Sequence, residues 1–127
     1  MQNQTPQISR AEWQVMKFIW KLGEPCSAQR VIDALSGPNE WSSTTIKTLL
    51  SRLVQKGALS FRKEGKAYYY SAAIAKTACL AAEADSFLDR VFDGSLTPLI
   101  AHFARGRGLR KKDIEELEAL IRETRKP

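Results

Sequence analysis

The feature that most constrains this chain is the segment from Ser42 to Gly57, whose apolar residues recur with the period of an α-helix. Four aliphatic residues share one face of the helical wheel: Ile46, Leu49, Leu50 and Leu53. The opposite face carries only hydroxyl, amide and cationic side chains: Thr44, Lys47, Thr48, Ser51, Arg52 and Gln55. Surface helices usually mix acids with bases, whereas this face has no acid, as a helix facing phosphates and base edges requires.

The next segment, ALSFRKEGKAYYYS, predicts a β-hairpin. Leu59 and Phe61 alternate with polar residues, which is the pattern of a half-buried strand, and three consecutive tyrosines form the return strand. Gly65 can supply the positive φ that a tight turn needs. A basic helix followed by a hairpin with a basic tip is the layout of a winged helix-turn-helix.

Two further helices are expected before this pair. Ser9 and Glu12 fit a capping box, and the helix that they begin should end at Gly23-Glu24-Pro25. Ser27 can cap a second helix, which we expect Gly37-Pro38 to stop, and Ser42 or Ser43 can cap the third. Trp13, Trp20 and Trp41 could serve as stacking platforms for single strands, but helical spacing favours packing in the core.

The remaining residues, 72–127, read as helix throughout, with breaks at Gly94-Ser95 and at the loop 105–108. Three short helices bury too little surface to enclose a core of their own, so their apolar stripes predict a second copy of the chain as partner. The predicted fold is therefore mainly α with a small β-ribbon. It comprises an N-terminal winged helix-turn-helix (residues 1–71) and a C-terminal helical dimerisation domain (residues 72–127).

The charge distribution agrees with a polyanionic partner. The net charge is +6 and the pI is about 9.6. Residues 1–71 hold ten Lys and Arg against five Asp and Glu, whereas the rest of the chain is nearly balanced. No apolar run approaches the ~20 residues of a membrane helix, and the polar N-terminus does not resemble a signal peptide. We expect a cytoplasmic protein that does not bind a membrane.

Catalytic and metal-binding patterns are missing from the sequence. It has no Gly-rich phosphate loop and no nucleophile beside a base, and its single histidine, His102, has no second ligand in register. We expect neither enzymatic activity nor a metal or cofactor. Cys26 and Cys79 have no metal-ligand spacing and are expected to be buried or semi-buried thiols, with a redox switch as the alternative.

Four segments in order resemble the penicillinase-repressor family, the winged-helix regulators of the BlaI, MecI and CopY type. They are ISRAEWQVMKFIW at 8–20, WSSTTIKTLLSRLVQKG at 41–57, AYYYS at 67–71 and DIEEL at 113–117. The resemblance implies a homodimeric repressor on an inverted-repeat operator in double-stranded DNA, and β-lactam resistance genes are among the targets that it implies. The C-terminal C-x-C pair of the copper-responsive branch is absent.

The resemblance also implies release of the operator by a sensor-controlled protease that cuts an Asn-Phe bond in the dimerisation domain. The matching position here is His102-Phe103, so the asparagine is replaced. Two alternatives stay open at this point, a protease of altered specificity or a different inducing signal.

The sequence thus yields one set of candidate DNA contacts on the third helix and the hairpin. The set is Ser43, Thr44, Thr45, Lys47, Thr48, Ser51, Arg52, Arg62, Lys63, Lys66 and Tyr68. The alternative is a winged-helix adaptor that binds protein partners, against which the acid-free helix face argues.

Overall fold

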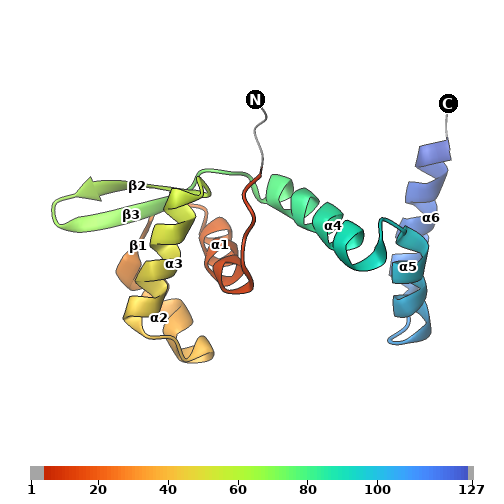
Figure 1. Cartoon of the computed structure of the whole chain (residues 1–127), viewed down its shortest axis with the longest axis horizontal. Coiled ribbons are helices and arrows are strands. Elements are labelled where there is room, and N and C mark those ends of the chain that lie inside the picture. The colour runs from red at the N-terminus through yellow and green to blue at the C-terminus, as the bar shows by residue number, and fades with distance from the viewer. Residues whose placement is uncertain (1–4, 126–127) are drawn as a thin grey trace. The chain divides into compact units, whose positions relative to one another are not determined.

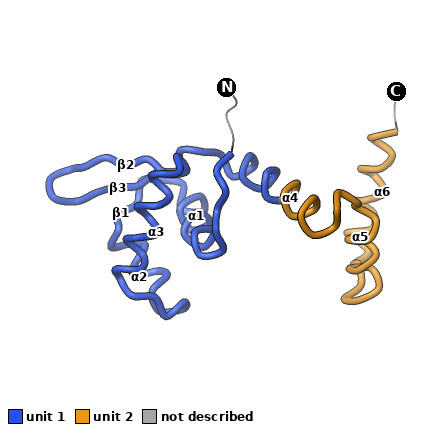
Figure 2. The backbone as a smooth tube through the Cα atoms, viewed as in Figure 1, with its two compact units in different colours: residues 1–83 blue, residues 84–127 orange. Residues whose placement is uncertain are grey.

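The computed structural model describes residues 5–125 and divides into two compact units, residues 1–83 and 84–127 (Figures 1 and 2). The first unit holds α1 (Arg10–Leu22), β1 (Cys26–Ser27), α2 (Ala28–Asn39), α3 (Ser43–Gln55), β2 (Leu59–Glu64) and β3 (Ala67–Ala72). The helix α4 (Lys76–Phe92) starts in the first unit, and α5 (Leu96–Arg105) and α6 (Lys111–Arg125) belong to the second. This element order confirms the predicted mainly α fold with a winged helix-turn-helix.

The predicted helix ends are confirmed at both ends of α1 and of α3. Ser9 and Glu12 form the complete capping box, and Gly23 follows α1 with a φ of 72°. The Ser42 hydroxyl accepts a hydrogen bond from the Thr45 amide at 3.1 Å, so Ser42 caps α3. Gly57 follows α3 with a φ of 82°, a conformation that a residue with a Cβ adopts only at a cost.

The predicted end of the second helix at Gly37-Pro38 is wrong, because α2 continues to Asn39. Its last turn is held by the Trp41 amide, which donates to the Ser36 carbonyl, and by the Ser36 hydroxyl, which donates to the Trp41 carbonyl at 2.8 Å. These bonds offset the one that Pro38 cannot donate. The left-handed residue that ends this helix is Glu40, with a φ of 56°.

Two other details differ from the sequence prediction. Residue 72 does not begin a helix, because Ala72 pairs with Leu59 in the sheet and α4 begins only at Lys76. A third strand, β1, pairs antiparallel with β3 through Cys26 and Tyr70, which gives the strand order β1-β3-β2.

The core lies within the first unit, between α1, α2, α3 and one face of the sheet. It is built from the aliphatic face of α3 together with Val15, Met16, Ile19, Val31 and Leu59. All three tryptophans pack partly buried against this cluster, and the Trp20 indole donates to the Ile74 carbonyl at 3.0 Å. Their expected role in packing is therefore confirmed. Cys79 of α4 is also buried in the core, so this unit continues past the sheet.

The second unit has no buried side chain among its described residues, 84–125. Large apolar side chains stand about half exposed along its helices. They are Phe87, Val91, Leu96, Ile114, Leu120 and Ile121. Within the described residues, no helix is long and apolar enough to cross a membrane.

Candidate nucleic-acid interface

The α3 helix presents its whole polar face to solvent. The seven predicted contact residues between Ser43 and Arg52 are all exposed, while Ile46, Leu49, Leu50 and Leu53 are at most 5% exposed. The aliphatic side fixes the rotation of the helix about its axis, because burying these four side chains leaves only one orientation for the polar side. The helical spacing of the aliphatic residues therefore determines which side chains of α3 enter the core and which form the candidate interface.

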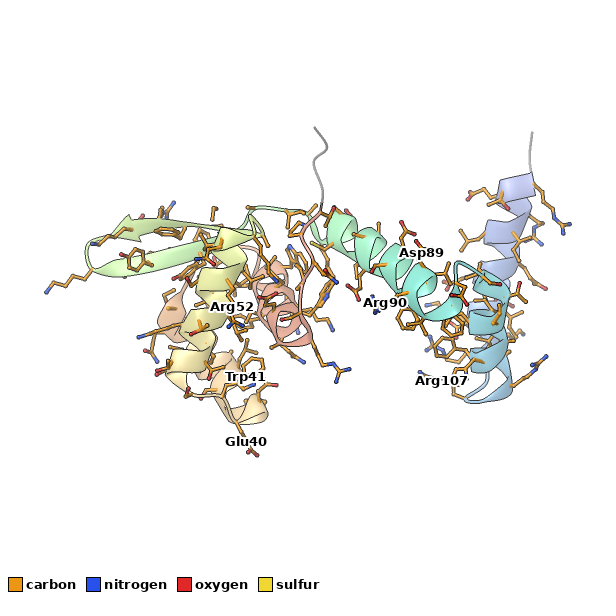
Figure 3. The ribbon with its side chains drawn as sticks, in the orientation of Figure 1. Glu40, Trp41, Arg52, Asp89, Arg90 and Arg107 are labelled. Atoms are coloured by element: carbon orange, nitrogen blue, oxygen red, sulfur yellow. The ribbon has the colours of Figure 1, made fainter. Side chains whose placement is uncertain are left out.

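The cations on this face are free to contact a ligand. Within residues 5–125, neither Lys47 nor Arg52 lies within 4.0 Å of a carboxylate, and Figure 3 shows Arg52 on α3. Near the start of the helix, the Thr45 and Ser42 hydroxyls lie 3.0 Å apart, so part of the hydrogen-bonding capacity of Thr45 is used in capping. Lys47, Thr48, Ser51 and Arg52 remain as donors without an internal partner in the described structure.

The hairpin separates its predicted contact residues onto two faces. Lys63 pairs in register with Tyr68, and its ammonium lies 5.7 Å from the centre of the Tyr68 ring. Arg62 points to the other face, where its Nε donates to Glu64 Oε2 at 2.7 Å. Lys66 lies in the two-residue turn after Gly65, whose φ is 64° as predicted. Among residues 5–125, Lys63 and Lys66 of the hairpin have no ion-pair partner, whereas Arg62 forms a solvent-exposed pair with Glu64.

An ion pair between the partly exposed Lys56 and the buried Glu12 anchors the C-terminal end of α3. Lys56 Nζ donates to Glu12 Oε1 at 2.5 Å and to the Gln7 carbonyl at 2.8 Å. Burial by itself raises the pKa of the Glu12 carboxyl, but the hydrogen bonds and charge of Lys56 and the bonds from Ser9 outweigh it, so that this pKa lies below its usual value. The start of α1 and the end of α3 are therefore tied together electrostatically.

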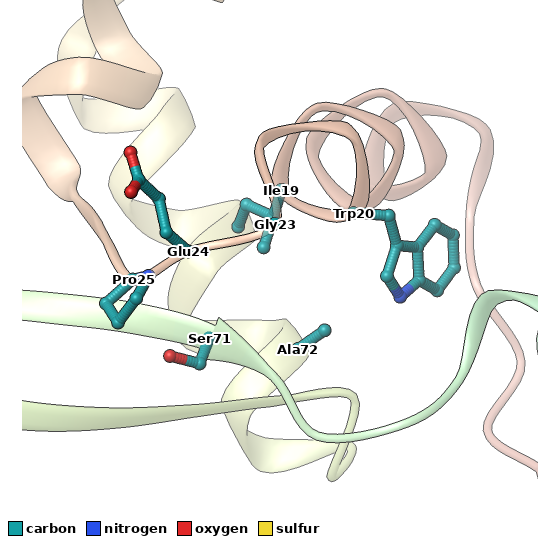
Figure 4. A pocket seen from close by; sticks show the side chains of 7 residues that line it. All are labelled: Ile19, Trp20, Gly23, Glu24, Pro25, Ser71 and Ala72. Atoms are coloured by element: carbon teal, nitrogen blue, oxygen red, sulfur yellow. The ribbon is translucent and has the colours of Figure 1, made fainter.

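A largely apolar cavity of about 250 Å³ lies between the end of α1 and the end of β3, lined by Ile19, Trp20, Pro25 and their neighbours (Figure 4). Its one carboxylate, Glu24, is exposed and lies 3.4 Å from Arg30. Within the described residues no group of His, Cys, Asp and Glu could hold a metal ion.

The two cysteines are buried thiols, as predicted. Cys26 is 1% exposed and Cys79 is 2% exposed, and both are reduced. Burial raises the pKa of both thiols, so little reactive thiolate forms near neutral pH. Burial and a raised pKa favour a packing role for the two thiols over a role as a redox switch.

The residues that match the predicted cleavage position lie in the last turn of α5. His102 is exposed and Phe103 is half-buried, and their rings meet edge to face with centroids 5.4 Å apart. A protease requires an extended backbone, so cutting here needs local opening of α5.

Sequence reasoning missed two residues near the interface. Lys56 was not singled out, because its partner Glu12 lies 44 residues away in the chain. Phe61 was expected to be half-buried by alternation with Leu59, yet 49% of it is exposed. The position of Phe61 near the hairpin tip indicates this exposure, because no other element covers a strand where it extends past the core.

Comparison with known proteins gives one consistent result. The family model described as "Penicillinase repressor" matches residues 8–123. The penicillinase repressor of Bacillus licheniformis is 38% identical over 118 residues, covering 93% of this chain and 91% of that protein. MecI of Staphylococcus aureus, named as a methicillin resistance regulatory protein, is 31% identical over 121 residues, covering 95% and 98%.

A solved structure similar to this chain is that of the monomeric form of B. licheniformis BlaI in complex with the blaP half-operator. The two are 44% identical in sequence with a TM-score of 0.52, and the match covers 59% of this chain and 90% of the other.

Proposed function

The chain belongs to the penicillinase repressor family, and on that basis we propose that it is a sequence-specific transcriptional repressor that binds double-stranded DNA. The observation that carries the proposal is the exposed face of α3, which has several hydroxyl groups, no acid and two cations that pair with no carboxylate among the described residues. The half-operator complex of the similar BlaI supports it. The function is regulatory, not catalytic, and the site of action is the cytoplasm.

In the proposed complex, α3 lies in the major groove. Lys47 and Arg52 contact bases or phosphates, and Thr44, Thr48 and Ser51 offer hydroxyl groups to base edges. Ser43 and Thr45 lie at the N-terminal end of the helix, where amides and hydroxyls suit a phosphate. Lys63, Lys66 and Tyr68 of the hairpin contact the adjacent backbone, while the pairing of Arg62 with Glu64 makes its contribution the smallest.

The active form in this proposal is a homodimer on an inverted repeat. The second unit supplies the interface, because its large apolar side chains stand exposed in the single chain. Two linked DNA-binding units bind two half-sites more tightly than either binds one, since the second contact becomes intramolecular. Residues 1–71 contain the proposed DNA contacts. Because Cys79 is buried in the core of the first unit, a truncated protein should extend to residue 83.

The regulated genes in this proposal are those of β-lactam resistance, by analogy with the named functions of the relatives. Release of the operator occurs either by cleavage near His102-Phe103 through a sensor-controlled protease or by another signal. Mass spectrometry of the protein from cells exposed to a β-lactam distinguishes the two. A fragment ending at residue 102 supports cleavage, and intact protein with induced target genes supports the other signal.

The DNA-binding proposal is tested by fluorescence anisotropy on the operator, which footprinting on DNA flanking the gene would locate. Lys47→Ala and Arg52→Ala should each weaken specific binding by about 1–3 kcal/mol. Lys17→Ala is the matched control, because Lys17 is an exposed lysine of α1 outside the proposed interface. A protein adaptor would show little affinity for any duplex at any salt concentration, and that result would refute the repressor function.

The dimer is tested by sedimentation of the full chain. The wild-type protein should sediment as a dimer, and Leu120→Asp should shift it to monomer and weaken binding to the full operator. The same change should leave binding to a single half-site intact. Monomeric wild-type protein that binds an inverted repeat tightly would contradict the homodimer.

A further inference from the structure

A cleft at the turn between α5 and α6 has no role in the function proposed so far, and it lies wholly within the second unit. Its volume is about 490 Å³. Six residues line it: Phe103, Arg107, Gly108, Leu109, Arg110 and Asp113. The cleft therefore combines an aromatic ring and an aliphatic side chain with two guanidinium groups and one carboxylate.

The charge around this cleft is strongly positive. Residues 94–112 contain no Asp or Glu. Five exposed cations fall within residues 105–112, namely Arg105, Arg107, Arg110, Lys111 and Lys112. Lys111 and Lys112 occupy the first two positions of α6, where the helix dipole disfavours cations. Solubility alone does not require cations at such positions, so the arrangement indicates an anionic ligand.

The two guanidinium groups of the cleft differ in their partners. Arg110 donates to the Asp113 carboxylate from Nε at 3.1 Å and from Nη2 at 3.2 Å, and its backbone amide donates to the same carboxylate at 3.2 Å. These hydrogen bonds lower the pKa of Asp113, so the carboxylate stays charged and keeps Arg110 in place. Among residues 5–125, Arg107 has no carboxylate within 4.0 Å, and Figure 3 shows it in the loop after α5. One fixed and one free guanidinium group therefore line the same cleft.

The loop that carries Arg107 is hydrogen-bonded to the last turn of α5. The Gly106 amide donates to the His102 carbonyl at 3.0 Å, and the Gly108 amide donates to the Phe103 carbonyl at 2.9 Å. Gly108 has a φ of 79°, a conformation that a residue with a Cβ adopts only at a cost. A ligand that holds Arg107 therefore also holds the carbonyls of the residues that match the cleavage position.

We propose that this cleft binds a small phosphate monoester that carries an apolar group. The phosphate lies between Arg107 and Arg110, because guanidinium groups match phosphate oxygens in geometry, and the apolar group lies against Phe103 and Leu109. A phosphate monoester suits the cleft better than a carboxylate, because it carries nearly two negative charges at neutral pH. The bound ligand holds the loop on α5 and shields the His102–Phe103 bond from local opening, a consequence that rests on the release by cleavage proposed above.

Isothermal titration calorimetry of the full-length protein with phenyl phosphate tests the site. We expect a Kd of about 1 mM or lower. Inorganic phosphate lacks the ring and should bind about tenfold more weakly. Arg107→Gln should weaken the binding of phenyl phosphate about tenfold, because it removes the charged hydrogen bonds of the free guanidinium group. Arg90→Gln is the matched control, because Arg90 is an exposed arginine of the same unit that does not line the cleft.

The basic face of α3 is the competing location for a phosphate, and two variants separate it from the cleft. Arg52→Ala should keep the affinity for phenyl phosphate, and Arg107→Gln should keep the affinity for the operator. The inference is overturned if phenyl phosphate does not bind, or if Arg52→Ala abolishes binding and Arg107→Gln does not. Wild-type protein that binds no duplex refutes the proposed DNA-binding function instead, and the calorimetry does not depend on that result.

Amide hydrogen exchange followed by NMR tests the link to α5. The Gly106 and Gly108 amides exchange when the loop opens, and opening requires the ligand to leave. At a phenyl phosphate concentration of about ten times its Kd, their exchange should slow about tenfold in the wild-type protein. In Arg107→Gln the same concentration should have much less effect. Exchange that is unchanged when phenyl phosphate saturates the wild-type protein would overturn the link between the cleft and the His102–Phe103 bond.

Discussion

The ion pair between Lys56 and Glu12 leads to a quantitative prediction for Lys56→Met. The Glu12 side chain is only 2% exposed, so without Lys56 its carboxylate would stay buried with the Ser9 bonds alone. Breaking a fully buried pair costs about 3–5 kcal/mol. Because the Lys56 side chain is 34% exposed, solvent already screens part of the interaction, and we expect a loss of about 2 kcal/mol at pH 7.

The assay is thermal unfolding of the full chain followed by circular dichroism. For a unit of this size, about 2 kcal/mol corresponds to a fall in the midpoint of about 8–16 °C. Lys17→Met is the matched control, because it makes the same substitution at an exposed site of α1 with no ion pair among the described residues. We expect its midpoint to stay within about 2 °C of the wild-type value.

The pH dependence tests the cause of the loss. The pKa of Glu12 is lowered in the folded wild-type protein, so its stabilisation is present above the ordinary carboxyl pKa and disappears as the pH falls through the lowered one. In Lys56→Met, burial should dominate and raise the pKa of Glu12. Protonation of Glu12 in mild acid then removes the unpaired buried charge and reduces the destabilisation of the variant. The difference between the two proteins should therefore shrink between pH 7 and pH 4. A difference that stays constant over this range would refute the electrostatic explanation.

Three further predictions concern local features of the first unit. Gly57→Ala should destabilise the protein by about 1 kcal/mol in urea unfolding, because its φ of 82° is costly for a residue with a Cβ, whereas Gly37→Ala inside α2 should stabilise it. Ser42→Ala should cost about 1 kcal/mol by the same assay through loss of the α3 cap, and an unchanged midpoint would argue against that cap. Cys26 and Cys79 should react with Ellman's reagent only slowly at neutral pH and at once in urea, and fast reaction of the folded protein would contradict their burial.

Features encoded within a few residues could be predicted from the sequence. The Ser9–Glu12 capping box, the Ser42 cap and the positive φ of Gly57 and Gly65 each depend on neighbours within one turn, and the structure has all of them. The exposed polar face of α3 follows from the same local periodicity.

Features that depend on distant partners could not be predicted in this way. The strand β1 is two residues long and exists only because Cys26 and Ser27 pair with β3, more than 40 residues later. The buried role of Glu12 in pairing with Lys56 has the same cause. The end of α2 was mispredicted because hydrogen bonds around Ser36 and Trp41 hold a turn that contains Pro38.

Local contacts and one long-range ion pair together position α3, and neither requires the side chains on the polar face of that helix. The aliphatic face and the Ser42 cap position α3 locally, and the Lys56–Glu12 pair fixes its far end from another helix. None of these contacts uses Lys47, Thr48, Ser51 or Arg52. Because those four side chains are exposed and make no internal hydrogen bond or ion pair in the described structure, we expect substitutions there to leave the fold unchanged and to alter DNA binding alone, which circular dichroism and anisotropy on the operator would check.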